Sequence, residues 1–398
     1  MPSICFYFQV HQPYRIKKYS VFDIGLDHKY FDDENLNEKG TRVVLEKVAQ
    51  KCYIPTSRIL LDLIHRNPEF KVSFSFSGIA LEQLERYSPE ALVLFQRLVK
   101  TGNVEILDET YYHSLSFFYS DEEFIRQVKM HREKIADLFD YEPKVFRNTE
   151  LSYNNELSTL VEKLGYDGIL TEGWEHYLGD RSPNFVYMPK GAQRLKLLLK
   201  NYKLSDDIAF RFSNRDWKEY PLYASKFSQW INSINGLGDT INLFMDYETF
   251  GEHQWEDSGI FHFLKALPAE VLKHPGNNFK TPSEIIATYE YAGELDVHNI
   301  LTWADTERDL SAWTGNSMQK SALKKLYEIE EDVLNSHDDL IKEDWRKLQT
   351  SDHFYYMCTK WFSDGDVHKY FSPYDSPYEA FISFMNVLND FRFRLDRA

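Results

Sequence analysis

The amino-acid sequence predicts an α/β fold with a mostly parallel sheet that closes, fully or nearly, into a barrel. Three observations lead to this prediction. Seven short apolar segments are typical of strands, helical patterns occupy the stretches between them, and long amphipathic patterns dominate from about residue 311 onward. Strands that alternate with helices favour a parallel sheet. Seven such repeats are more typical of a barrel than of an open sheet.

The predicted strands are short, and most are rich in β-branched or aromatic residues. Continuous apolar runs of this kind are typical of strands that are buried on both faces. They lie at residues 4–10, 71–76, 103–107, 144–147, 167–171, 194–200 and 241–245.

The helices between these strands are predicted from their periodicity and their ends. Ser88 followed by Pro89 is typical of an N-cap and a first helical position, and Gly102 and Gly165 are typical of helix C-termini. The predicted helices cover residues 55–67, 88–102, 121–139 and 154–165. We therefore interpret residues 1–310 as the barrel and residues 311–398 as a helical region that packs at the barrel mouth.

Composition narrows the class of ligand. The chain has 398 residues and a formal net charge of −16, which disfavours nucleic acid and anionic membranes as partners. Aromatic residues make up 16% of the chain, and because sugar rings stack on aromatic faces this mildly favours a carbohydrate ligand. The sequence contains none of the common glycine-rich nucleotide motifs and no G-x-S-x-G motif. It gives no information on oligomeric state.

The cysteines and the N-terminus favour a cytoplasmic location. The three cysteines are scattered and do not form a C-x-x-C pair, so no disulfide framework is expected. The first residues, MPSICFYFQVHQP, lack the basic region of a signal peptide, and their apolar run is too short to span a membrane.

Polar residues gather where four of the predicted strands end. In parallel barrels the carboxyl ends of the strands carry the active site. These strand ends bring His11, Glu105 with Asp108 and Glu109, Arg147 with Glu150, and Asp246 with Glu248. Paired carboxylates in such a place suit glycoside hydrolysis, in which one acid must be ionised and the other protonated.

Five segments also resemble glycoside hydrolase family 57, in order along the chain. They are HQP (11–13), GNVEIL (102–107), FRNTEL (146–151), FMDYETFGEHQW (244–255) and LTWADTERDLSAWTGN (301–316). The stretches FRNTELSYN and YETFGEHQW and the tail TSDHFYYMCTKWFSDGDVHKYFSPY are most similar to its α-amylase group. The resemblance implies an incomplete (β/α)7 TIM-like barrel, a helical C-terminal region and a retaining mechanism on α-glucans such as starch, glycogen or maltodextrin.

The resemblance also implies roles for single residues. Glu150 matches the catalytic nucleophile and Asp246 the general acid/base, while His11 and Glu105 match substrate-binding positions. His253 and Arg147 each stand where some family members have Trp; for His253 these are notably the glucanotransferases, and both positions are expected near the substrate.

Three further residues are assigned to the substrate site from their chemistry and position. We expect Glu248 to raise the pKa of Asp246 through like-charge repulsion. Trp303 and Trp313 either stack on glucose units or belong to the core, and stacking is the stronger expectation for Trp313.

Three other functions remain open on the sequence. A 4-α-glucanotransferase would use the same acids, and a non-catalytic glucan-binding homologue would keep the fold without turnover. A metal-dependent polysaccharide deacetylase would need clustered histidines. The 13 histidines here are never closer than nine residues, so we expect no metal and no cofactor.

Overall fold

All seven predicted strands form in the structure, a computed structural model that describes residues 2–32, 34, 37–360 and 372–397. Three further strands of two residues each occur within the described chain. The strands are β1 (Ser3–Val10), β2 (Val72–Phe76), β3 (Val104–Ile106), β4 (Val145–Arg147), β5 (Gly168–Glu172), β6 (Met188–Pro189), β7 (Lys196–Lys200), β8 (Thr240–Asp246), β9 (Asn278–Phe279) and β10 (Glu294–Leu295).

The four predicted helices are also present, with ends that differ by a few residues from the prediction. They are α2 (Ile54–Arg66), α4 (Pro89–Val99), α5 (Asp121–Phe139) and α6 (Asn155–Lys163). Other helices before residue 311 are α1 (Thr41–Val48), α3 (Gly78–Tyr87), α7 (Glu175–Leu178), α8 (Tyr202–Ala209), α9 (Ala224–Ser233), α10 (Ile260–Leu272) and α11 (Pro282–Thr288). A π-helical turn, Ala49–Tyr53, joins α1 to α2.

The strands form two main parallel sheets, which confirms the α/β class. One sheet has the order β3-β2-β1-β8, with β9 also paired to β1, and the other has the order β4-β5-β7. A single parallel bridge between Asp108 and Phe146 joins β3 to β4. Near the other junction, the Asn201 N–H donates to the Asn242 carbonyl over 2.8 Å. In the β1–β8 pair Gln9 lies opposite Asp246, so the carboxyl ends of these strands meet.

Side chains from both sheets pack together on one face. Cys5 and Tyr7 of β1 belong to the same buried cluster as Phe244 of β8, Leu170 of β5 and Leu198 of β7. Alternate residues of a strand point to opposite faces. The opposite face of β1 therefore carries Phe6 and Phe8, which belong to a larger outer core.

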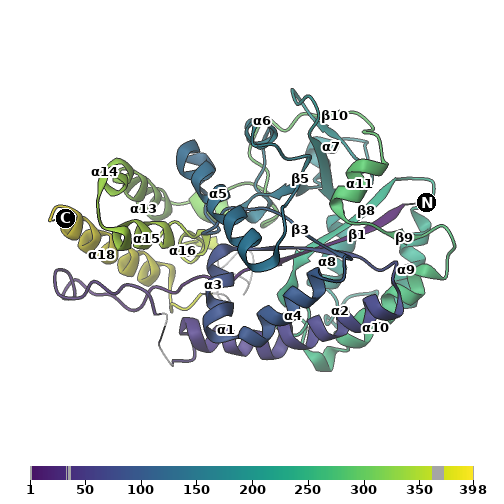
Figure 1. Cartoon of the computed structure of the whole chain (residues 1–398), viewed down its shortest axis with the longest axis horizontal. Coiled ribbons are helices and arrows are strands. Elements are labelled where there is room, and N and C mark those ends of the chain that lie inside the picture. The colour runs from purple at the N-terminus through teal and green to yellow at the C-terminus, as the bar shows by residue number, and fades with distance from the viewer. Residues whose placement is uncertain (1, 33, 35–36, 361–371, 398) are drawn as a thin grey trace.

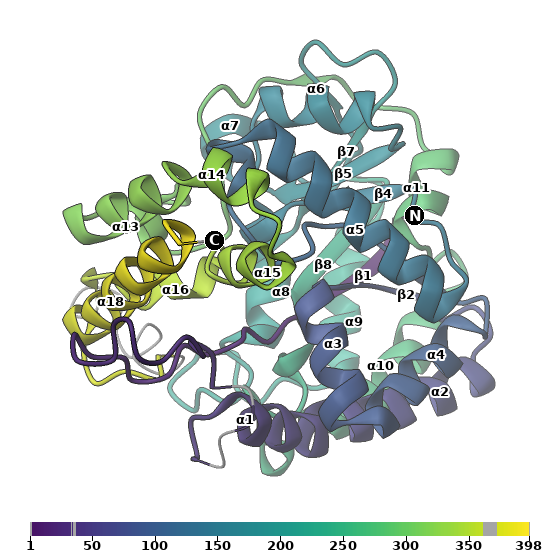
Figure 2. The same cartoon turned by 60° about the vertical axis from the view of Figure 1, so that its left-hand side comes forward.

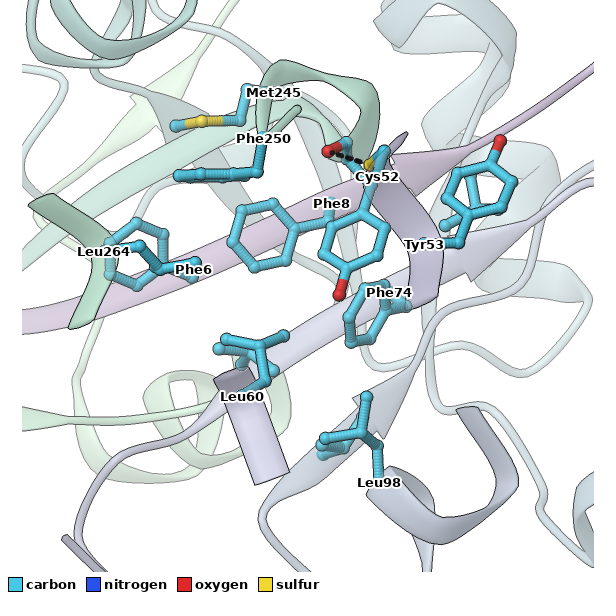
Figure 3. Close-up of a cluster of buried hydrophobic side chains, with 14 of the residues drawn as sticks. Phe6, Phe8, Cys52, Tyr53, Leu60, Phe74, Leu98, Met245, Phe250 and Leu264 are labelled. Carbon is cyan, nitrogen blue, oxygen red and sulfur yellow. Dashed lines mark hydrogen bonds between the residues drawn. The ribbon is translucent and has the colours of Figure 1, made fainter. Parts of the chain in front are cut away.

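The outer core lies between the first sheet and its helices. Figure 3 shows Phe6, Phe8 and Phe74 of the strands against Leu60 of α2 and Leu264 of α10. Burial of this aromatic and aliphatic surface stabilises the packing of helix on sheet, at roughly 1.5–3 kcal/mol for each large side chain. In the same view the Tyr53 hydroxyl points away from the core.

The chain from residue 311 onward is helical in its described part. It contains α12 (Ser311–Thr314), α13 (Ser317–Tyr327), α14 (Glu330–Asn335), α15 (Asp339–Lys347), α16 (Ser351–Tyr355) and α18 (Pro377–Leu395). These helices lie on the side toward which β1 runs from the N-terminus (Figures 1 and 2). Their core is shared with residues from earlier in the chain, among them Tyr14, Tyr30 and Tyr112.

Candidate active site

Glu150 follows β4 on a short 3₁₀ turn, Thr149–Leu151. Both Glu150 and Leu151 have positive φ angles, of 60° and 49°. Residues other than glycine rarely adopt this left-handed conformation, which costs energy and is concentrated at functional sites. The Asn148 side chain closes the turn by donating to the Ser152 hydroxyl over 2.8 Å. The Glu150 side chain is thus directed by a backbone that its neighbours hold in place.

Three side chains surround the Glu150 carboxylate. The Trp303 indole Nε1–H donates to Oε2 over 2.8 Å, and the Ser351 hydroxyl donates to Oε1 over 3.0 Å. The His113 Nε2 lies 3.6 Å from Oε1. The Glu150 side chain is 17% exposed, so one part of it remains accessible. The three partners are far from Glu150 in sequence.

Two stacked histidines lie next to Glu150. The rings of His11 and His113 are 3.9 Å apart between centroids, with an angle of 18° between their planes. The His11 Nε2 lies 2.8 Å from the Asp352 carboxylate, and its Nδ1 lies 2.7 Å from the Ser77 hydroxyl. The His113 Nδ1 lies 2.9 Å from the Glu109 carboxylate. The pair therefore connects the ends of β1 and β3 to α16.

Asp246 ends β8 and has a raised pKa. Burial is the main cause and the charge on Glu150 is the second, and together they raise the pKa of Asp246 to about 6. The expected repulsion by Glu248 is therefore not the principal like-charge effect on Asp246. Glu150 behaves in the opposite way: burial favours its neutral form, but His113 and the Arg147 charge bring its pKa below the ordinary value. In the pH range between the two pKa values, Glu150 is ionised while Asp246 still carries its proton.

Glu248 follows Asp246 on a 3₁₀ turn, Tyr247–Thr249. Its carboxylate accepts hydrogen bonds from the Tyr53 hydroxyl and, over 3.4 Å, from the Gln12 amide. Burial and the charge on Asp246 raise the pKa of Glu248 to about 8. Tyr53 comes from the π-helical turn, which carries its hydroxyl to this position. Glu248 is therefore a buried, largely neutral acid at neutral pH.

Arg147 is fully buried beneath Trp303. Its guanidinium carbon lies 4.8 Å from the centre of the Trp303 ring, a cation–π distance. Its three guanidinium nitrogens have no hydrogen-bond partner among the described residues. The Arg147 charge lowers the pKa of Glu109, Glu150 and Asp246. Arg147 thus acts on the carboxyl groups through its charge and presents no open surface to a ligand.

The ends of β5 and β7 add an ionic network that the sequence analysis did not include. Lys200 Nζ lies 3.5 Å from Glu172 and 3.1 Å from Asp206, and the Arg308 guanidinium lies 2.6 Å from Glu172. Lys200 also lies 5.6 Å from the Trp303 ring centre. This network ties the loop that carries Trp303 to the strand ends.

Two of the expected substrate residues lie elsewhere. The Glu105 carboxylate accepts from the Ser283 backbone N–H and hydroxyl, over 2.9 and 2.6 Å, at the start of α11. It therefore stabilises a helix N-terminus rather than joining Glu150. Trp313 is 1% exposed in the core of the helical region, so it is a packing residue. Stacking on glucose was expected more for Trp313 than for Trp303. That ranking is wrong, because Trp313 is buried in the core and Trp303 is the tryptophan beside Glu150.

His253 lies at the margin of the cluster. Its backbone N–H donates to the Glu248 carbonyl over 2.9 Å. Burial lowers the pKa of His253 to about 4, so the ring is neutral at neutral pH. Its expected contact with substrate stays a prediction.

Sequence reasoning missed His113, Ser351 and Asp352 as site residues. A signal for His113 was available, because it follows Glu109 by four residues just after the third strand. Ser351 and Asp352 belong to the tail whose resemblance was noted, TSDHFYY at its start. Residues 361–371 of that tail lie outside the described residues.

Two kinds of feature are absent from the described residues. No group of three or more His, Cys, Asp or Glu residues in residues 2–32, 34, 37–360 and 372–397 is placed to hold a metal ion. Over the same residues, no helix combines the length and apolar character needed to cross a membrane.

Comparison with known proteins identifies close similarities. The sequence model of glycosyl hydrolase family 57 matches residues 5–298. A provisionally named alpha-amylase of Methanocaldococcus jannaschii is 45% identical over 403 residues, covering 98% of this chain and 84% of that protein.

Solved structures show the same fold. A branching enzyme of Pyrococcus horikoshii has a TM-score of 0.68 at 15% identity, covering 89% of this chain and 85% of that one. The 4-alpha-glucanotransferase of Thermococcus litoralis has a TM-score of 0.64 at 18% identity, covering 89% of this chain and 56% of that one.

Proposed function

Because the chain belongs to glycosyl hydrolase family 57, we propose that it is a retaining hydrolase of the α-amylase type. Its proposed substrates are starch, glycogen or maltodextrin, cleaved at α-1,4-glucosidic bonds. The similarity to the M. jannaschii protein supports the α-amylase type. The observation that carries the proposal is the opposite pKa shift of two carboxyls, downward for Glu150 and upward for Asp246.

The proposed reaction divides the work between these acids. Glu150, ionised, attacks the anomeric carbon and forms a glycosyl ester, while Asp246, protonated, gives its proton to the leaving oxygen. Asp246 then takes a proton from water, which attacks the ester and releases the sugar with its configuration retained. Two acids with separated pKa values are the general requirement of such a mechanism.

The other proposed roles follow from contacts with these two acids. Trp303 and Ser351 hold the two oxygens of Glu150, so they orient its lone pairs for attack. Trp303, which is partly exposed, is proposed to contact the sugar ring, and His11 a sugar hydroxyl. Because the Arg147 guanidinium is buried, its proposed role is electrostatic.

We propose that the two sheets form an incomplete (β/α)7 barrel, residues 1–310, with residues 311–398 packed at its mouth. The cluster of inward residues from β1, β4, β5, β7 and β8 supports the barrel. Contacts of Ser351 and Asp352 with Glu150 and His11 support the position of the helical region. In this arrangement the helical region supplies part of the active site.

A 4-α-glucanotransferase is the second candidate, favoured by the fold shared with the T. litoralis enzyme. In both functions a glycosyl-enzyme forms, and the acceptor, water or sugar, decides the product. His253 is smaller and more polar than the Trp that glucanotransferases have at this position, on which a sugar acceptor could stack. This difference favours water as the acceptor.

Product analysis on maltoheptaose tests the proposal. Hydrolysis by the wild type would give mainly shorter maltooligosaccharides, and their first-formed anomer would be α as in the substrate. A ladder that also extends above seven glucose units would assign the transferase. No turnover of any α-glucan would overturn both, and activity that survives a strong chelator would count against the metal-dependent deacetylase class. His253→Trp should raise the ratio of transfer to hydrolysis; an unchanged ratio would remove His253 from acceptor choice.

A further inference from the structure

His113 lies between two carboxylates that face opposite sides of its ring. Its Nδ1 is 2.9 Å from Glu109 Oε2, and its Nε2 is 3.6 Å from Glu150 Oε1. A carboxylate only accepts hydrogen bonds, so each ring nitrogen favours a bound proton. The side chain is 3% exposed, so water does not compensate either carboxylate at this point. The geometry therefore favours the imidazolium form of His113.

The neighbouring histidine has the surroundings of a neutral ring. The His11 Nε2–H can donate to Asp352, and its Nδ1 can accept from the Ser77 hydroxyl, which itself accepts from the Ala80 N–H over 3.3 Å. Two stacked imidazolium rings would repel each other. The pair is therefore one charged and one neutral ring, with the charge on the ring that faces Glu150.

The position of the His113 ring is also fixed by its backbone. His113 has a φ of 51°, and its N–H donates to the Thr110 carbonyl over 3.1 Å. Its carbonyl accepts from the Ser351 N–H over 2.9 Å, while the Ser351 hydroxyl donates to Glu150. The start of α16 thus binds both the histidine and the carboxylate that it faces.

We infer that His113 is a positioning residue whose positive charge holds Glu150 ionised and aligned for attack. This inference rests on the proposed function, in which Glu150 is the nucleophile. It extends that proposal to a residue that need not touch the substrate.

The charges around His113 agree with this assignment. Burial opposes its charged form, but Glu109 and Glu150 raise the pKa of His113 to about 9. The groups whose charges interact with His113 are Glu109 on its own segment, His11 just after β1, Glu150 after β4, Asp246 on β8 and Asp352 on α16. Arg147, at the end of β4, acts on the same carboxyls. Removal of the His113 charge should raise the pKa of Glu150 and also that of Asp246, since His113 lowers both.

The test is the pH profile of kcat/KM on a chromogenic maltooligosaccharide. His113→Gln should lower kcat/KM about 10- to 100-fold at the wild-type optimum, a loss of the size expected when a carboxylate loses one charged partner. Both limbs of the profile should move to higher pH, and His113→Lys should return the acid limb toward its wild-type position. A merely structural histidine would lower the rate without moving the limbs, and that result would overturn the inference.

A matched control and a second measurement complete the test. His28→Gln removes a histidine that also pairs with a carboxylate, Asp390, but away from Glu150. It should leave both limbs unchanged. ¹⁵N NMR of wild-type protein labelled at histidine should show that the His113 ring stays charged up to about pH 9. Against the effect of burial, Asp108 also raises the pKa of His131, so the His113 signal is assigned by its absence in His113→Gln and its retention in His131→Gln. If the His113 ring is neutral by pH 8, the inference fails even where His113→Gln does not fold, because His131→Gln still assigns the signal. A wild type without turnover on α-glucans would overturn the proposed function, and the NMR result would still decide the charge of His113.

Discussion

The candidate site contains two pairs of buried carboxyls whose pKa values shift in opposite directions. On one side Glu109 and Glu150 lie among His113 and Arg147, and their pKa values are below the ordinary value despite burial. On the other side Asp246 and Glu248 are also buried, and their pKa values are raised to about 6 and about 8. The difference shows that the neighbouring charges, and not the residue type or the depth of burial, set the protonation state of each carboxyl.

The largest expected effect is the loss of the ionised acid. Glu150→Gln should bind maltoheptaose yet lose nearly all turnover, because a neutral amide cannot form the glycosyl ester. The loss should be several powers of ten, on the order of 4–7 kcal/mol in the barrier. Turnover and calorimetric binding measure the two properties separately.

The matched control is Glu105→Gln, which changes a carboxylate that binds the start of α11. It should keep activity within about tenfold, since one lost hydrogen-bonded helix cap affects mainly stability. Residual activity of Glu150→Gln close to that of the wild type would remove Glu150 from its role.

The second effect concerns Asp246, the acid with the raised pKa. Asp246→Asn should slow cleavage of maltooligosaccharides by about 10²–10⁴-fold, the usual contribution of a general acid. A substrate with an activated aryl leaving group needs no proton, so its first step should be affected much less. Comparison of the two substrates in burst kinetics measures this difference. Equal losses on both would show that Asp246 is not the proton donor.

The third effect separates two tryptophans that lie ten residues apart. Trp303→Phe removes the N–H that binds Glu150 but keeps a ring above Arg147, so kcat should fall about 10- to 100-fold. The acid limb should move to higher pH, because a lost donor raises the pKa of Glu150. Trp313→Phe should instead lower the melting temperature and leave the profile in place. The reverse pattern in the two variants would contradict the assignment.

The smallest effect is on stability, and its sign differs between the two sides. The pKa of Glu109 falls to about 2 in the folded state, so its carboxylate contributes stability above pH 4.5 that is lost as pH falls toward 2. Glu109→Gln should therefore destabilise the protein at pH 7, by about 1–3 kcal/mol.

The pKa of Glu248 is raised to about 8, so the folded state loses stability as pH rises from 4.5 to 8. Glu248→Gln should therefore raise the melting temperature at pH 8, by about 2–4 °C. Melting curves of both variants from pH 4.5 to 8 measure the contrast, and shifts of the same sign would refute it.

Local sequence patterns were sufficient to predict the main strands and helices of the fold. The seven strands and four helices predicted from apolar runs, periodicity and end residues all form, since alternation and capping act over a few neighbouring residues. The positions of Glu150 and Asp246 at strand ends follow from the same pattern. Their roles as nucleophile and proton donor remain predictions.

Tertiary structure decided which side chains meet. Glu105 and Glu109 are four residues apart, yet one binds the start of α11 and the other binds His113. Ser351 lies 201 residues from Glu150 and contacts its carboxylate. Such contacts depend on how sheets and helices pack, and no local pattern specifies them.

By itself the sequence determined the α/β class, the strand ends that carry the acids, and membership of a glycosidase family. Only the tertiary structure decided that Trp303 rather than Trp313 faces Glu150, and that His113 and Arg147 lower the pKa of Glu150 despite its burial, while burial and Glu150 raise that of Asp246. The physical reason is that a pKa or a hydrogen bond depends on distances of a few ångströms between residues far apart in sequence. Packing sets those distances, whereas residue order sets the elements that pack.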